Sequence, residues 1–354
     1  MDLHKKNYYY FVDLLRWLAA MGVLLFHYAS HFNISGIDNS FFFNYLIENN
    51  TIGSYGVWLF WCVSGFVFTN VYLNNKSSLK EFAIKRFARL YPLHFITLII
   101  ISILQYYSME KFTHFQIFQK NDILRFIENI FFINEGNNFN AVIWSISVEI
   151  PVYFIFFFYL KFNKNHILIK TIILITFLWF DLRLGLLYYN LSACLFYFFL
   201  GVLVFLFCSL MRRFNFFLLI ISIIAISITP YIFEIKNSLL LIKYRNYIPT
   251  TLLFFCSLLT LCFSLEKYLH KFGKRIKFLG DSSYAIYLIH IPIQILILIL
   301  SDLNIIHLEI FASYKSLIIF FILVNLIAYF IFKLLESPIR KKITIFLHKK
   351  LVKI

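Results

Sequence analysis

Residues 11–31 read FVDLLRWLAAMGVLLFHYASH, an apolar stretch in which Asp13 and Arg16 are the only formally charged side chains. About 20 apolar residues in a helix are needed to cross the hydrocarbon core of a bilayer. The stretch therefore predicts a membrane-spanning helix. Because it also holds His27 and no small-residue cleavage site follows it, it makes a poor secretion signal, and we expect it to be retained as the first span.

The composition of the 354-residue chain points the same way. Hydrophobic residues make up 61% of it and charged residues 14%, and the mean hydropathy is +0.79. Soluble domains are about half apolar and about one quarter charged. These values exclude a soluble globular enzyme, a disordered chain and a secreted disulfide scaffold. They predict an all-α polytopic membrane protein, in which the five cysteines, all within apolar runs, serve as packing residues.

Apolar runs between charged or Asn/Gly-rich breaks predict about ten transmembrane helices, which we expect to form one integral-membrane domain over residues 1–354. The fifth run is short and carries Lys170. The expected spans lie near 11–31, 52–73, 89–107, 141–160, 167–181, 186–207, 214–233, 248–265, 283–300 and 316–335.

The basic residues of the loops orient these spans. With ten spans and both termini in the cytoplasm, 22 of the 33 Lys and Arg residues fall in cytoplasmic segments and 8 in outer segments. The net charge of +16 thus reflects cationic cytoplasmic loops and not a nucleic-acid partner. The longest loop, 108–140, is expected outside, with an amphipathic piece at Ile123–Phe132.

Ionisable side chains inside spans are costly, so each is a candidate for function. His27 follows Arg16 by eleven residues, which in a helix is a rotation of about 20° beyond three full turns. Both side chains therefore lie on one face of the helix, about 16 Å apart along its axis. Asp13 is an i,i+3 neighbour of Arg16 and can pair with it. A snorkelling arginine and a structural core histidine are the alternatives, but the shared stripe favours a functional site.

Four further groups are candidates. Arg86 and Arg89, at the cytoplasmic start of the third span, suit phosphate groups, although taken alone they are better explained as ordinary positive-inside cations, which are commonplace at this position. Glu149 is expected at a depth similar to that of His27, where a carboxylate would orient an imidazole. His290 lies within the ninth span. Glu336 could pair with one of the arginines, although helix termination by Pro338 is the simpler interpretation.

Several of these segments occur in the same order in a known family. The chain resembles the acyltransferase-3 family of bacterial integral-membrane O-acyltransferases, and the resemblance covers nearly its whole length. The similar motifs are Arg16-x10-His27, the GVWLF segment 56–60 with SGF at 64–66, Arg86-x-x-Arg89 with Tyr91-Pro92, WSISVE at 144–149, SYAIYLIH at 283–290 and Glu336-x-Pro338. Trp58 departs from the family's usual Asp, and Ile150-Pro151 replaces its usual Glu-Gln.

The resemblance implies an O-acetyltransferase of the cell membrane that uses acetyl-CoA from the cytoplasm as donor substrate, with no permanently bound cofactor and no metal. Its acceptor would be a hydroxyl of a cell-surface or lipid-linked glycan, such as an O-antigen or exopolysaccharide, and membrane lipid its other partner. His27 would be the catalytic base or a transient acyl carrier, oriented by Glu149.

The same resemblance places Arg16, Arg86 and Arg89 at the donor, and makes Asp13, Tyr284 and His290 candidate substrate-site residues. A multi-span transporter or flippase is the competing class, because transporters also carry buried ionisable residues. The paired, Gly/Pro-interrupted spans in two halves that are typical of many transporters are not evident in the sequence.

Overall fold

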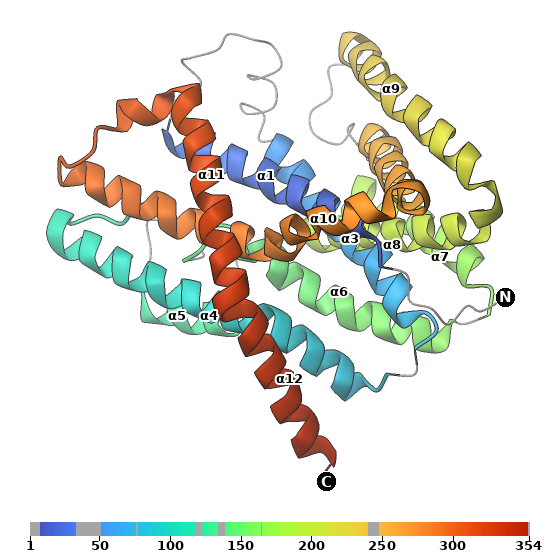
Figure 1. Ribbon diagram of the computed structural model, residues 1–354, viewed down its shortest axis with the longest axis horizontal. Coiled ribbons are helices and arrows are strands. Elements are labelled where there is room, and N and C mark those ends of the chain that lie inside the picture. Colours follow the sequence, from blue (N-terminus) through green and yellow to red (C-terminus); the bar gives the residue numbers. More distant parts are fainter. Residues whose placement is uncertain are drawn as a thin grey trace. The chain divides into compact units, whose positions relative to one another are not determined.

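The computed structural model describes residues 8–32, 51–75, 77–117, 122–133, 139–163, 165–239 and 248–352. Within these ranges all regular secondary structure is helical (Figure 1). The principal helices are α1 (Tyr10–Phe32), α3 (Thr51–Tyr72), α4 (Leu79–Phe112), α5 (Ile123–Ile130), α6 (Ile143–Phe162), α7 (Ile167–Leu184), α8 (Tyr189–Leu210), α9 (Asn215–Leu239), α10 (Ile248–Asp302), α11 (Tyr314–Ile331) and α12 (Ser337–Val352). Some cations that orient the predicted spans lie outside the described residues: Lys5, Lys6, Lys76, Lys120, Lys164, Lys243, Arg245 and Lys353.

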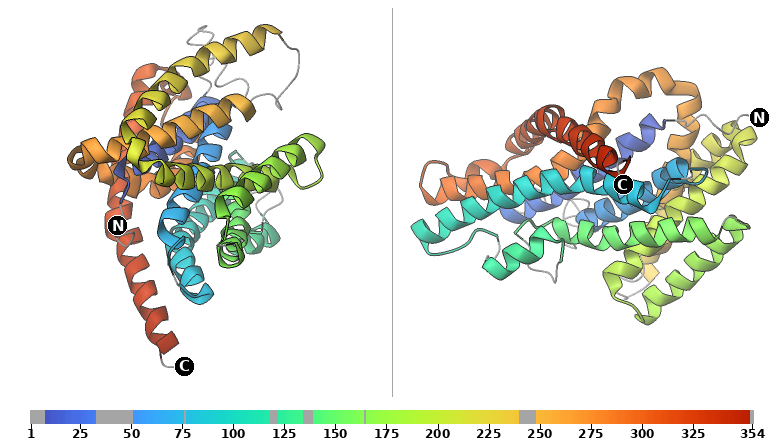
Figure 2. Two further views of the ribbon diagram at one scale, coloured as in Figure 1. Left: turned by 90° about the vertical axis from the view of Figure 1, so that its right-hand side faces the viewer. Right: turned by 90° about the horizontal axis from the view of Figure 1, so that it is seen from below.

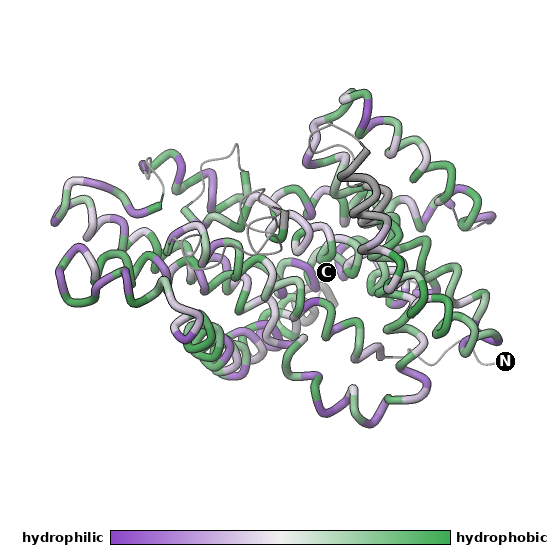
Figure 3. The backbone as a smooth tube through the Cα atoms, turned by 90° about the horizontal axis from the view of Figure 1, so that it is seen from above, coloured by the Kyte–Doolittle hydropathy of each residue, from purple (hydrophilic) through white to green (hydrophobic). Residues whose placement is uncertain are grey.

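Eight helices in the described part of the chain are long and apolar enough to cross a membrane. Hydrophobic residues dominate the helical segments (Figure 3). The chain is therefore an all-α polytopic membrane protein, as the sequence predicts.

The eight candidate helices and the ten predicted spans differ for two local reasons. The predicted spans 248–265 and 283–300 both fall within α10, which runs for 55 residues and is kinked at Leu269. The predicted span 167–181 is helical as α7, but this helix carries Lys170, Asp181 and Arg183 among its 18 residues and is not one of the eight. Every predicted span thus falls on a helix, although fewer helices qualify as spans.

The chain divides into two compact units that each draw on three segments. The first unit comprises Met1–Ala19, Val57–Lys76 and Val148–Gly280, and the second comprises Ala20–Gly56, Ser77–Ser147 and Asp281–Ile354. Helices α1, α3, α6 and α10 each contribute residues to both units.

Close backbone contact between α3 and α8 characterises the first unit. A Cβ atom added to Gly65 would lie far inside van der Waals contact of the Phe198 carbonyl, and one added to Gly201 would meet the Cys62 carbonyl in the same way. Glycines permit such an approach because they present no side chain to the neighbouring helix. The two helices therefore pack backbone to backbone at this crossing.

Replacing Gly65 with alanine is expected to destabilise the protein, because the added methyl group must push α8 away. Overpacking of this kind costs about 1–3 kcal/mol. Thermal unfolding in detergent should show a clearly lowered Tm. The matched control is Gly22→Ala on α1, where the added Cβ would lie 3.5 Å from its nearest neighbour, the Ile52 carbonyl oxygen. A Gly65→Ala protein as stable as Gly22→Ala would contradict the close packing.

Polar contacts at the helix ends fix the relative directions of the spans in the second unit. Tyr28, near the end of α1, donates a 2.8 Å hydrogen bond to the Phe311 carbonyl, just before α11 begins. Arg89, in the first third of α4, pairs with Glu336 at the far end of α11. Helix α11 therefore runs opposite to α1 and to α4, which is the alternation that the predicted order of spans requires.

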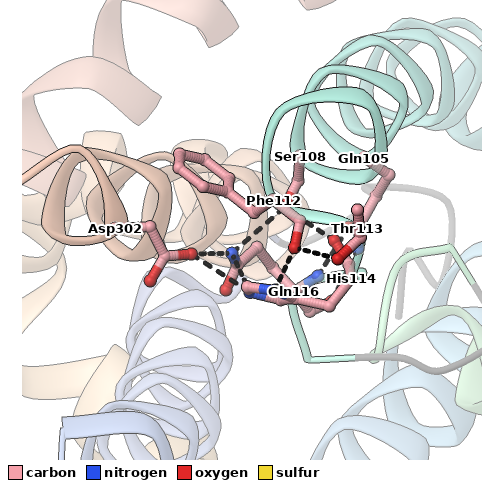
Figure 4. Close-up of polar contacts among 7 residues, drawn as sticks. All are labelled: Gln105, Ser108, Phe112, Thr113, His114, Gln116 and Asp302. Atoms are coloured by element: carbon pink, nitrogen blue, oxygen red, sulfur yellow. Dashed lines mark hydrogen bonds and ion pairs between the residues drawn. The ribbon is translucent and has the colours of Figure 1, made fainter.

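A polar cluster joins the C-terminal ends of α4 and α10 (Figure 4). The His114 imidazole Nε2 lies 3.1 Å from the Asp302 carboxylate, and the side-chain amide of Gln116 donates to Asp302 and to the Ser108 hydroxyl. The side chain of Gln105 exchanges two hydrogen bonds with the Gln116 backbone. The cluster holds α4 and the second half of α10 parallel, with their C-terminal ends together.

The amphipathic piece expected at Ile123–Phe132 is present as α5, and two described residues between α4 and α6 bond to the middle of other helices. The backbone carbonyl of Asn129 accepts a 2.8 Å hydrogen bond from His94, which lies about 28 Å along α4 from Thr113 at its C-terminal end. The side chain of Asn140 donates a 2.9 Å bond to the Leu288 carbonyl.

The Asn140 contact has a local cause in α10. Pro292 has no N–H group, so the carbonyl of Leu288 four residues earlier lacks its helical donor. The amide of Asn140, which is 1% exposed, supplies the missing hydrogen bond. Asn140 is thereby bonded to α10 at Leu288, two residues from His290.

The long C-terminal helix also departs from expectation. Helix α11 passes through a five-residue π-helical turn, Phe332–Glu336, and continues as α12 through Pro338 (Figure 2, left). The prediction that Pro338 ends the tenth span is wrong. The proline is accommodated because it lies in the first turn after the π-helical segment, where the normal bonding pattern is already broken.

Candidate functional site

Three histidines of the second unit lie together where α1 and α10 meet. The ring centroid of His27 is 5.4 Å from that of His290 and 5.7 Å from that of His31. His27 is partly exposed, whereas His290 is completely buried. The structure thus brings together two of the predicted site residues, His27 and His290, and adds His31.

The hydrogen bonds of this histidine cluster determine which nitrogens carry protons. Nδ1 of His290 lies 3.0 Å from the carbonyl of Ile286, so it must be the protonated nitrogen, because a carbonyl can only accept. In the neutral ring Nε2 then carries a lone pair, and it has no hydrogen-bond partner among the described residues. Nδ1 of His31 lies 2.7 Å from the Gln294 side-chain oxygen. The Gln294 amide nitrogen is likewise buried and without a partner in the described part of the chain.

An arginine group lies nearer the N-terminal end of α4 in the same unit. The Arg89 guanidinium is 2.8 Å from the Glu336 carboxylate, whose side chain is 2% exposed. The same guanidinium lies 5.6 Å from the centroid of the Tyr284 ring, and the Tyr284 hydroxyl donates a 2.6 Å bond to the carbonyl of Leu90. Glu336 therefore forms an ion pair with Arg89. From the sequence this pair was the weaker alternative to simple helix termination by Pro338.

Further charges surround this pair. Arg340 lies close enough to interact electrostatically with Arg86, Arg89, Glu336 and Asp281. Three guanidinium groups and two carboxylates thus share one region, which leaves a net positive charge of one. Such a region can bind an anion while its own cations stay partly neutralised.

Helix α10 connects the arginine group to the histidine cluster. Tyr284 contacts Arg89, and His290, six residues further on, contacts His27. Six residues of helix correspond to about 9 Å. The two groups are therefore close enough for one extended molecule to reach both.

Three of the predicted site residues belong to the first unit. Arg16 pairs with Asp13 at 2.8 Å, as the i,i+3 spacing predicts, and the Tyr8 hydroxyl also donates to Asp13. Glu149 is 9% exposed and lies near Cys194. Because His27 belongs to the second unit, the orienting role of Glu149 and the donor role of Arg16 stay predictions.

The position of Trp58 and the arrangement of metal-ligating side chains also bear on the site. Trp58, which departs from the family motif, stacks on Tyr197 with ring centroids 5.0 Å apart and an interplanar angle of 14°. Its position is therefore part of an aromatic packing contact in the first unit. Among the described residues no group of three or more His, Cys, Asp or Glu side chains is arranged to hold a metal ion.

Sequence reasoning missed His31, Gln294 and Arg340. A usable signal exists for the first two: His31 follows His27 by four residues, and Gln294 follows His290 by four. Residues i and i+4 lie on the same face of a helix, so each pair is aligned. The same spacing links Glu336 to Arg340, but the neighbourhood of Arg340 with Arg86, Arg89 and Asp281 could not be found in this way, because those three residues are distant in the sequence.

Comparison with known families identifies the family of the chain. A family model described as an acyltransferase domain, that of the acyltransferase-3 family, matches residues 9–334. Comparisons with curated proteins and with solved structures give no match. The match includes His27, His290 and both arginines of the Arg86-x-x-Arg89 motif. Since it covers nearly the whole chain, the chain belongs to the acyltransferase-3 family.

Proposed function

We propose that this membrane acyltransferase transfers an acetyl group from cytoplasmic acetyl-CoA to a hydroxyl of a cell-surface or lipid-linked glycan, in the plasma membrane of a bacterium. The observation that carries the proposal is the short path in the second unit between the arginine group and the histidine cluster. An acyl-CoA combines phosphates at one end with a thioester at the other, so it suits a site that is basic at one end and holds an imidazole at the other.

His27 is the proposed general base. It takes the proton from the acceptor hydroxyl while the oxygen attacks the thioester carbonyl. When the carbon–sulfur bond breaks, the same proton passes to the sulfur, and free CoA leaves. General-base assistance of this kind contributes about 10²–10⁴-fold to a rate. A transient acyl-histidine is the alternative route through the same side chain.

The donor phosphates are proposed to bind at the arginine group. Arg86, Arg89 and Arg340 are the proposed contacts, because their three guanidinium groups outnumber the two neighbouring carboxylates, Glu336 and Asp281. Bidentate guanidinium–phosphate pairing gives both attraction and orientation. The donor is a substrate that departs after each turnover.

Transfer of labelled acetyl provides the test. Membranes that contain the protein, supplied with acetyl-CoA labelled in the acetyl group, are expected to incorporate label into a glycan fraction, and matched membranes without the protein are not. A transporter or flippase would leave incorporation unchanged while altering glycan distribution across the membrane. Absence of protein-dependent label in any acceptor fraction would refute the proposal.

A further inference from the structure

Two buried polar atoms with opposite hydrogen-bonding character lie one turn apart on α10. Nε2 of His290 is an acceptor, and Nε2 of Gln294 is a donor. Both side chains are 0% exposed, and neither atom has a partner among the described residues. Leaving such groups unsatisfied in a protein interior is costly, so native structures usually supply a partner.

A single group that satisfies both atoms must both donate and accept a hydrogen bond. A hydroxyl group donates one hydrogen bond and accepts others, so one hydroxyl can donate to His290 and accept from Gln294. The i,i+4 spacing places the two side chains on the same face of the helix, about 5–6 Å apart at their Cβ atoms, a gap that one oxygen can bridge. A carboxylate or a phosphate would leave the His290 lone pair without a donor.

This hydroxyl cannot be the one that reacts with the acyl donor. A hydroxyl carries a single proton, and the reacting hydroxyl must direct it to His27 for general-base catalysis. A hydroxyl that donates to His290 is therefore a second one on the same acceptor. The rings of His27 and His290 are 5.4 Å apart, which suits two hydroxyls on neighbouring carbons, each donating to one ring.

We infer that His290 and Gln294 form a subsite for a non-reacting hydroxyl of the acceptor, and that the acceptor is a vicinal diol acylated next to a free hydroxyl. The inference rests on the proposed function. His31 contributes by holding the Gln294 side-chain oxygen, which fixes the amide so that its nitrogen is presented as a donor. The subsite distinguishes polyols, such as sugars, from simple alcohols.

Substitutions that keep size but remove one hydrogen-bonding atom test the subsite. His290→Phe and Gln294→Leu are expected to lower acetyl transfer to the membrane glycan at least 100-fold. His290→Gln, which offers a side-chain oxygen as acceptor, should recover to within about tenfold of wild type. The matched control is Gln105→Leu, which removes another buried amide from the same unit but outside the site, and should transfer acetyl at a rate close to wild type.

Two readouts separate this role from a structural one. Acetyl-CoA should raise the Tm of the His290→Phe and Gln294→Leu proteins as much as it raises that of wild type, because the donor site is intact. The Tm of His290→Phe without ligand should equal or exceed that of wild type, since a buried unpaired nitrogen has been removed. Loss of transfer together with loss of the acetyl-CoA shift would overturn the inference.

The product gives an independent check. NMR of the acetylated glycan should place the ester on a carbon whose neighbour bears a free hydroxyl. An ester with no adjacent hydroxyl, or wild-type transfer by either single variant, would overturn the subsite. Failure of the proposed function looks different, because wild-type protein would then transfer no acetyl at all.

Discussion

The His27→Ala protein is expected to fold normally and to transfer acetyl about 10²–10⁴-fold more slowly than wild type, the range that general-base assistance contributes. The imidazole of His27 is in contact with both His31 and His290, and it is partly exposed, so a substrate can reach it. Truncation removes the base and leaves the donor site in place. The rate should therefore fall while the KM for acetyl-CoA changes little, which is measurable with labelled donor.

A second histidine of the same unit provides the control. His114 is exposed and belongs to the polar cluster at the ends of α4 and α10. His114→Ala should transfer acetyl at close to the wild-type rate. If His27→Ala retains a rate within tenfold of wild type, the assignment of His27 as the base is wrong.

Arg86→Ala and Arg89→Ala are expected to differ in kind, although the two residues share one sequence motif. Arg89→Ala leaves the Glu336 carboxylate, with 2% of its side chain exposed, without its ion-pair partner, and breaking a buried pair in this way costs about 3 kcal/mol. A lowered Tm should follow. Arg86→Ala should instead raise the KM for acetyl-CoA about tenfold, because a charge-assisted bond to phosphate contributes about 1.5 kcal/mol or more.

A double variant separates the two effects. Arg89→Ala combined with Glu336→Gln removes the buried charge together with its partner, so much of the lost stability should return. The comparison uses thermal unfolding for stability and acetyl-CoA titration for donor use. An unchanged KM in Arg86→Ala would contradict a donor site at this arginine group, and an unchanged Tm in Arg89→Ala would contradict the ion pair as a stabilising contact.

Much of the fold could be predicted because membrane-spanning helices are encoded locally. Residues 11–31 meet the length and apolarity that a bilayer demands, and the structure has α1 over Tyr10–Phe32. The sequence does not show where one helix passes into the next. The charged residues between 265 and 283 suggested a loop between two spans. The backbone instead stays helical through this segment, apart from the kink at Leu269.

The candidate site was predicted in part. Helical periodicity places His27 on the same helix face as Arg16. It cannot predict that this face packs against His290 on α10, since such a contact depends on packing between distant segments. The same reason explains Glu336, where the local proline suggested a helix end and the actual partner, Arg89, lies 247 positions earlier. The contacts of Asn129 with α4 and of Asn140 with α10 had no local signal, because both asparagines resemble ordinary loop residues.

The bond from Asn140 to α10 has a practical consequence for redesign. Exchanging the connection between α4 and α6 for that of another family member would test what this connection contributes to activity. The incoming segment would also have to bring an amide or hydroxyl to the Leu288 carbonyl, since Pro292 leaves that oxygen dependent on a donor from outside its own helix. A graft lacking such a donor would disturb the helix that bears His290, and its loss of turnover could be mistaken for a direct effect of the exchanged residues on catalysis.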